Sequence, residues 1–133
     1  MTERNLKNAE YRTKINIETL ETLKKQVIKK LLFEGKYKDK AYSANKLAKD
    51  LNTNSRYISA TINHCFKVNY NELVNKYRID EAKLLLQNSD LKDLNIDYIA
   101  KMVGFSSSQS FYVAFKNLVK ATPLKYRKQF QNK

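Results

Sequence analysis

The sequence predicts an all-α protein: two helix-turn-helix subdomains joined by a long linker helix, with an extra amphipathic helix at the N-terminal end. Only two glycines and one proline interrupt its 133 residues. Apolar residues recur at helical spacing, and no segment alternates as a strand does. A stretch of the first half of the chain also returns in the second half, which indicates a repeated structural unit. The length suits one compact domain or two small subdomains that share a core.

The N-terminal region divides into a polar arm and a helix. Residues 1 to about 15 are polar, charged and without periodicity, which predicts a flexible arm. The apolar residues that follow fall on one face of a helix: Ile17, Leu20, Leu23, Val27, Ile28, Leu31 and Leu32. This helix is too short for a stable coiled coil, so we expect it to pack on the next subdomain rather than to dimerise. Gly35 ends it, and residues 34–40 form a loop.

The first helix-turn-helix is expected over about residues 43–66. Ser43 caps a helix that runs through Leu51, residues 52–54 make a turn, and a second helix runs from Ser55 to about Cys65. The long linker helix follows Asn69 and covers about residues 70–87. Its apolar residues lie on more than one side, with Leu73, Val74 and Tyr77 early and Ile79, Ala82, Leu85 and Leu86 later. We therefore expect it to pack against both subdomains.

The second helix-turn-helix is expected over about residues 96–119. Residues 88–95 break the helical pattern, and a short helix then runs from Ile96 through Val103 and ends at Gly104. A C-terminal helix over about residues 123–130 starts with Thr122 as its cap and Pro123 at its first position.

The internal repeat pairs the two halves residue by residue. The segment LAKDLNTNS at 47–55 aligns without gaps with IAKMVGFSS at 99–107. In each copy two apolar residues form a buried stripe, an alanine allows close helix crossing, and Asn or Gly tolerates a left-handed turn. The pairs are Leu47 and Ile99, Ala48 and Ala100, Leu51 and Val103, and Asn52 and Gly104.

The correspondence continues through the second helices of the two units. Asn54 and Ser106 are expected to cap them, with Ile58 and Ile62 pointing inward in one copy and Phe111 and Phe115 in the other. After the caps, the offset between the two copies is one residue larger. It continues to the end of the repeat and pairs Lys67 with Lys120, Asn69 with Thr122, and Leu73 with Tyr126. A purely structural helical repeat, as in a solenoid, would share these features.

The charge balance points to a polyanionic partner. Lys and Arg number 26 against 13 for Asp and Glu, which gives a formal net charge of +13. Such an excess favours nucleic acid as the ligand. A soluble domain with a lysine-rich surface is the alternative.

Several other function classes are disfavoured. No apolar run approaches the roughly 20 residues of a membrane-spanning helix, and the N-terminus has no signal-peptide core, so we expect a cytoplasmic protein without a membrane partner. Cys65 and His64 are the only residues of their types, which excludes a disulfide or a Cys/His metal cluster within one chain. Adjacent helical residues point about 100° apart, so these two are a poor nucleophile and base pair. We expect no enzyme activity and no cofactor.

Two segments resemble a known family. The run IAKMVGFSSSQSFYVAFKNLVKATPLKYR at 99–127 resembles the signature of AraC-type transcription regulators, and RIDEAKLLL at 78–86 resembles that family's linker helix. The likeness covers about residues 43–127 and identifies residues 16–133 as an AraC-type DNA-binding domain. It implies two recognition helices that enter successive major grooves on one face of a duplex. A linker of about 25 Å, at ~1.5 Å per residue, suits modules near one DNA turn of ~34 Å apart.

Carried over by position, the resemblance implies a DNA-binding surface on both recognition helices. Arg56 and Gln109 are the best candidates for base readout, since Arg pairs bidentately with guanine and Gln with adenine. Serines at helix starts, together with Lys116, suit phosphates. The implied DNA-binding residues are Ser55, Arg56, Ser59, Ala60, Asn63, Ser107, Ser108, Gln109, Tyr112, Val113 and Lys116, with Lys67 and Lys120 as phosphate contacts. The alternatives are a solvated charge for Arg56 and side-chain packing for Tyr112.

The sequence departs from the family pattern in three ways. Lys67 and Lys120 stand where glycines are usual, and Ala60 and Val113 stand where larger polar residues are usual. The first recognition helix is therefore expected to read few bases and to depend more on DNA shape and phosphates. Residues 92–94 lengthen the connection before the second unit, which affects the spacing of the two half-sites.

These features together predict a sequence-specific transcription regulator that binds double-stranded DNA as a monomer at a bipartite site. A contact with RNA polymerase is implied by the resemblance only, and no small-molecule effector site is evident. One alternative is a sequence-tolerant nucleoid protein, which would show a small specificity ratio. The other is a helical protein-interaction adaptor, which would not bind DNA.

Overall fold

The computed structural model describes residues 17–131, and the arm expected over residues 1–15 lies outside this range. The described chain is helical, and no strand occurs within it. Its first helix, here the N-terminal helix, covers residues 17–28 and continues into a π-helical turn, η1 (Lys29–Phe33). There follow η2 (Lys36–Lys38), α2 (Ala44–Asp50), α3 (Ser55–Phe66), α4 (Tyr70–Gln87), η3 (Ser89–Leu91), α5 (Ile96–Met102), α6 (Ser108–Val119) and α7 (Pro123–Gln131).

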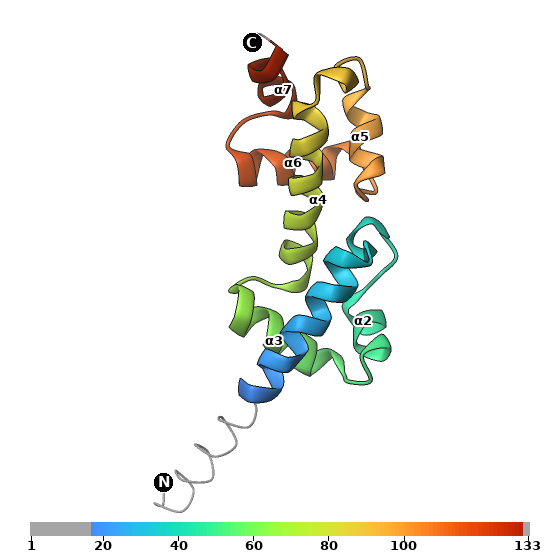
Figure 1. The fold of residues 1–133 in the computed structure, drawn as a ribbon, viewed down its shortest axis with the longest axis vertical. Helices are drawn as coiled ribbons and strands as arrows, with labels where there is room; N and C mark the ends of the chain where they lie inside the picture. Colours follow the sequence, from blue (N-terminus) through green and yellow to red (C-terminus); the bar gives the residue numbers. More distant parts are fainter. Residues whose placement is uncertain (1–16, 132–133) are drawn as a thin grey trace, which may run out of the picture.

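The long helix α4 lies between two groups of helices (Figure 1). The N-terminal helix, α2 and α3 surround its first half, and α5, α6 and α7 surround its second half. None of the helices in residues 17–131 is both long enough and apolar enough to cross a lipid bilayer.

Each group of helices has its own hydrophobic core, and α4 contributes to both. Leu73 and Val74 belong to the first core, together with buried residues of α2 and α3. Ile79, Ala82 and Leu86 belong to the second core, with residues of α5, α6 and α7. The expectation that this helix packs on two sides is confirmed. Burial of its apolar residues in both cores fixes the two groups of helices to one rigid element.

The N-terminal helix packs on the first group, as its amphipathic pattern predicts. Val27 and Leu31 are fully buried members of the first core. The predicted apolar face is only partly covered, because Ile17 and Leu32 remain 38% and 41% exposed. Gly35, with φ of 75°, ends this helical segment as expected.

The region expected to be a plain loop contains the short helix η2, so that expectation was incomplete. Its central residue Tyr37 is buried, and the ring centroids of Tyr37 and Tyr77 are 6.1 Å apart. Burial of this aromatic side chain against α4 stabilises the turn. The polar composition around Tyr37 hid this contact.

The helix caps follow the sequence closely, with one exception. Ser43 Oγ accepts a hydrogen bond from the Lys46 amide at 3.2 Å, and Asn69 Oδ1 accepts one from the Glu72 amide at 2.8 Å. The cap predicted at Ser106 is wrong: Ser107 is the cap of α6, and its Oγ accepts from the Ser110 amide at 3.1 Å. The turn between α5 and α6 is one residue longer than the turn between α2 and α3. This accounts for the change in repeat offset.

Candidate nucleic-acid interface

Helix α3 has one buried face and one exposed face. Ile58 and Ile62 are fully buried, and the Asn54 side chain caps the helix by accepting from the Tyr57 amide at 3.0 Å. The residues predicted to face DNA are all exposed: Ser55, Arg56, Ser59, Ala60 and Asn63. Their spacing of one, three and four places them on the helix surface opposite the two isoleucines.

Helix α6 repeats this arrangement around an aromatic core. Phe111 and Phe115 are fully buried, and their ring centroids lie 5.6 Å apart. The predicted DNA-facing residues Ser107, Gln109, Tyr112, Val113 and Lys116 are exposed, and Ser108 is half-buried. The hydroxyl of Ser107 is engaged as the helix cap, which leaves it less free for a ligand than the other residues.

Tyr112 packs against a neighbouring ring, which is one of the two alternatives the sequence left open. Its ring lies 5.8 Å from the Phe111 ring in an edge-on orientation, while 38% of the residue remains exposed. Packing on one edge fixes the side chain, and the free surface remains available for a partner.

The C-terminal ends of α3 and α6 share an unusual backbone conformation. Lys67 and Lys120 are the residues after these helices, and both have positive φ values, 62° and 66°. A glycine would adopt this left-handed conformation without strain, whereas a lysine does so at a cost. Both lysines are exposed, which leaves their ammonium groups free in solvent.

The two exposed helix faces carry no negative side chain. Neither α3 nor α6 contains an Asp or Glu, although the chain has 13 such residues. The carboxylates that form ion pairs in the described chain belong to other elements: Glu34, Glu81 and Glu21. A polyanion therefore meets no charge repulsion on either face.

A junction around Arg78 holds the two groups of helices together. Arg78 on α4 donates a hydrogen bond from Nε to the carbonyl oxygen of Tyr37 at 2.6 Å. Its guanidinium also lies over the Phe105 ring, 5.5 Å from the centroid. Gly104 completes the junction, because a Cβ atom there would come within 2.8 Å of the Lys38 carbonyl oxygen. The turn between α5 and α6 is thus fitted closely against η2.

Sequence reasoning did not assign this junction. Arg78 stood out only as the first residue of the linker motif, and Gly104 only as a turn residue. The contact joins residues 41 positions apart, so no local pattern reveals it. The sequence indicated only a loop over residues 34–40, with no contact assigned to Tyr37.

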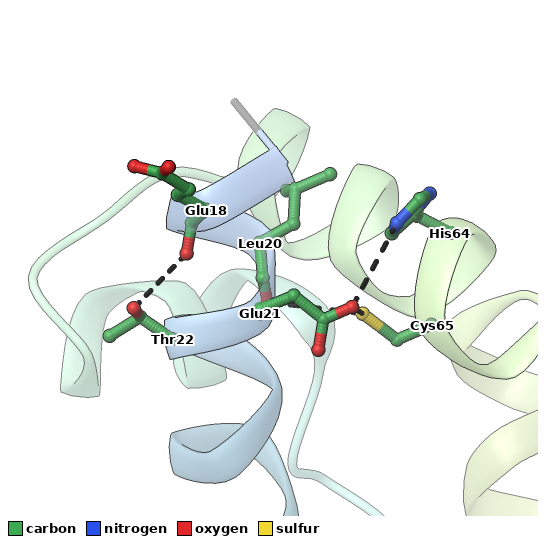
Figure 2. Close-up of polar contacts among 6 residues, drawn as sticks. All are labelled: Glu18, Leu20, Glu21, Thr22, His64 and Cys65. Carbon is green, nitrogen blue, oxygen red and sulfur yellow. Dashed lines mark hydrogen bonds and ion pairs between the residues drawn. The ribbon is translucent and has the colours of Figure 1, made fainter. Parts of the chain in front are cut away.

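The single histidine and cysteine contact the N-terminal helix instead of forming a reactive pair. Glu21 Oε1 lies 3.9 Å from His64 Nε2 and 3.9 Å from Cys65 Sγ (Figure 2). The thiol also lies 3.9 Å from the Leu20 carbonyl oxygen. Burial, and then the Glu21 carboxylate, raise the pKa of the Cys65 thiol, which disfavours a nucleophilic thiolate.

No metal-binding constellation is found in the described residues. Within 17–131, no three His, Cys, Asp or Glu side chains come together in a way that could hold an ion.

Comparison with known proteins relates the chain to helix-turn-helix proteins. A family described as "Helix-turn-helix domain" matches residues 47–129. The Msm operon regulatory protein of Streptococcus mutans is 34% identical over 88 residues, which is 66% of this chain and 31% of that protein. The chain thus spans about a third of the length of the curated relatives it matches.

Two solved structures have the same arrangement of helices. One is the C-terminal domain of the two-component response regulator yesN from Fusobacterium nucleatum, with a TM-score of 0.65, 28% identity, and coverage of 80% of this chain and 96% of that one. The other is the C-terminal domain of AraT, a response regulator from Geobacillus stearothermophilus, with a TM-score of 0.66, 25% identity, and coverage of 83% and 84%.

Proposed function

Because the chain belongs to the AraC-type family of helix-turn-helix DNA-binding domains, we propose that it is a sequence-specific transcription regulator that reads one DNA duplex with α3 and α6. The observation that carries this proposal is the pair of exposed, acid-free helix faces held by a single rigid helix, α4. In a helix-turn-helix the second helix of each unit enters the major groove. A connection through α4 would place the two helices in successive grooves.

The chemistry of each side chain indicates which part of the DNA it would contact. Arg56 on α3 and Gln109 on α6 would read base edges, because their side chains form bidentate pairs with guanine and adenine. Lys116, Lys67 and Lys120 would contact phosphates, which contributes affinity without sequence preference. The small side chains of α3, such as Ala60, would leave part of its specificity to DNA shape.

The domain and its partners are part of the same proposal. We take the DNA-binding domain to begin near residue 16, since the N-terminal helix is part of the first core. The protein would act in the cytoplasm by binding rather than by catalysis, and would affect transcription through a contact with RNA polymerase. The name of the Msm operon regulatory protein, a relative at 34% identity, supports a role in transcription. No effector is required by the two-helix readout itself.

Selection of bound sequences from random duplex DNA tests the function. We expect two short motifs about one helical turn apart. Arg56→Ala should remove the preference at one motif, and Gln109→Ala at the other, each with a loss of ~1–3 kcal/mol of discrimination. Lys116→Ala is the matched contrast, because loss of a phosphate contact weakens binding to all sequences about equally. Equal affinity for selected and scrambled duplexes would overturn the proposal in favour of a sequence-tolerant DNA-binding protein.

A further inference from the structure

An open hollow of about 890 Å³ lies between the two groups of helices. Its floor is α4, and its walls include Ser59 of α3 on one side and Ser110 of α6 on the other. A second hollow of about 410 Å³ continues along α6 past Gln109 and Val113. Asn75 of α4 lines both. The two hollows therefore join the surfaces that the recognition helices present.

The lining of both hollows suits an anion. No Asp or Glu lines either of them. Asn71 and Asn75 lie four residues apart, on the same face of α4. Neither side-chain amide is hydrogen-bonded to another residue of the described chain, so both have free donors. Amide donors in a lining without carboxylates favour binding of phosphate oxygens.

A half-buried arginine without an ion-pair partner in the described residues lines the same floor. Arg78 follows Asn75 by three residues, and it belongs to none of the ion pairs within residues 17–131. Within the described residues, its one hydrogen bond runs from Nε to the Tyr37 carbonyl oxygen, and the guanidinium also lies over the Phe105 ring. Burial lowers the pKa of this guanidinium, and Tyr70 and then Asp39 oppose the effect, Asp39 from beyond ion-pair distance. An anion in the hollow would offset this unfavourable desolvation.

The position of the hollow limits which anion can reach it. When α3 and α6 lie in two successive major grooves of one duplex, the DNA backbone between those grooves passes across α4. The phosphates of that backbone segment would face Asn71, Asn75 and Arg78.

We propose that the floor of this hollow is a binding site for DNA backbone phosphates between the two half-sites, with Asn71 and Asn75 as donors and Arg78 as the positive charge. The inference rests on the proposed function, and it adds the linker helix to an interface otherwise formed by the recognition helices. The contact is independent of base sequence, and it favours duplexes whose central segment bends toward α4.

The test combines changes in the protein with neutralised phosphates in the DNA. Asn75→Asp and Asn71→Asp place a carboxylate in the site, and each should weaken binding to the selected duplex roughly tenfold or more, the value of one hydrogen bond to a charged group. Replacing single central phosphates by neutral methylphosphonates should weaken binding of the unchanged protein. At the contacted phosphate, the losses of affinity from the Asp substitution and from the methylphosphonate should not add, which a double-mutant cycle measures.

A control variant and a thermal melt separate binding from folding. Lys76→Gln changes an exposed residue of α4 that lines neither hollow, and it should not couple to the central phosphates. Inorganic phosphate is the probe for a free-anion site. It should raise the melting temperature of the protein only slightly, because a single phosphate lacks the tethering that the duplex supplies.

Each outcome decides between the possibilities. If the losses of affinity from Asn75→Asp and from each central methylphosphonate simply add, the site is overturned. If Arg56→Ala still weakens specific binding in that case, the proposed function stands. Strong stabilisation by millimolar inorganic phosphate, with no effect of central methylphosphonates, would assign the hollow to a free anion instead of DNA. Absence of duplex binding by the unchanged protein would overturn the proposed function itself.

Discussion

Arg78 donates a hydrogen bond to the carbonyl oxygen of Tyr37 at 2.6 Å and so ties the linker helix α4 to η2. On its other side the guanidinium lies 5.5 Å from the centre of the Phe105 ring, in the turn between α5 and α6. One side chain thus contacts the segment that precedes the first helix-turn-helix and the turn of the second. This junction holds the two recognition helices at one relative angle.

Loss of the junction should relax the spacing of the two half-sites. Arg78→Lys keeps the charge but loses the planar guanidinium that bonds and stacks at once. We expect a broader range of accepted spacings in a DNA selection, and a loss of about 1–2 kcal/mol in the free energy of unfolding. An unchanged, single preferred spacing would show that the hydrophobic packing of α4 alone sets the angle.

The two glycines should differ in their response to alanine. At Gly104, φ is 112° and a Cβ atom would lie 2.8 Å from the Lys38 carbonyl oxygen, so Gly104→Ala should reduce the free energy of unfolding by about 2–3 kcal/mol. At Gly35, φ is 75° but no atom lies within 4 Å of the added Cβ, so Gly35→Ala should lose only about 1 kcal/mol. Urea denaturation measures both. Equal losses would mean that backbone strain, and not the contact with η2, governs Gly104.

Replacing Lys67 or Lys120 by glycine should raise stability and weaken DNA binding. Replacing either by glycine relieves a left-handed conformation and should raise the free energy of unfolding by about 0.5–1 kcal/mol. The same change should weaken duplex binding and reduce the slope of log K against log salt by ~0.9 if the lysine contacts one phosphate. Lys76→Gly, in the middle of α4, is the control and should destabilise by ~1 kcal/mol. A stabilised variant with an unchanged salt slope would remove that lysine from the interface.

Stability should fall at alkaline pH because a buried tyrosine, Tyr37, and a half-buried one, Tyr70, must stay protonated. Burial, and then the Glu81 carboxylate, raise the pKa of Tyr37 to about 12, and burial raises that of Tyr70 to about 12 although Arg78 opposes it. An unfolded tyrosine titrates near ~10. The folded state thus holds these protons to higher pH, so their contribution is complete below about pH 10 and is lost as the pH rises towards 12.

Tyr70→Phe isolates one of these groups. The Tyr70 hydroxyl donates to the Tyr42 carbonyl oxygen at 2.7 Å, so the variant should lose about 1 kcal/mol at pH 8. Between pH 10 and 12 its free energy of unfolding should fall less steeply than that of the unchanged protein. Parallel curves from urea melts at several pH values would assign the alkaline loss to other groups.

The local features of the fold could be predicted because they depend on short-range physics. The bounds of α4, the caps at Ser43 and Asn69, and the inward faces of α3 and α6 all follow from residue types a few positions apart. The cap of α6 was misplaced by one residue, because Ser106 and Ser107 are chemically equivalent and only the length of the turn distinguishes them.

The features that depend on distant residues could not be predicted in this way. The junction at Arg78 joins η2 to the linker helix, and the hollow over Asn75 is formed by elements from both halves of the chain. The exposure of the predicted DNA-facing residues follows from the burial of the apolar residues on the opposite helix face. Their contacts with bases and phosphates remain predictions.

The most direct test of two-helix readout on one duplex is a spacer series. The affinity of the purified protein is measured for the selected site and for versions with five or ten base pairs inserted between the two motifs. Because α4 fixes both recognition helices, we expect one favoured spacing, with either insertion reducing the affinity to that of a single motif. Affinity that does not change with the spacer would contradict simultaneous binding by α3 and α6.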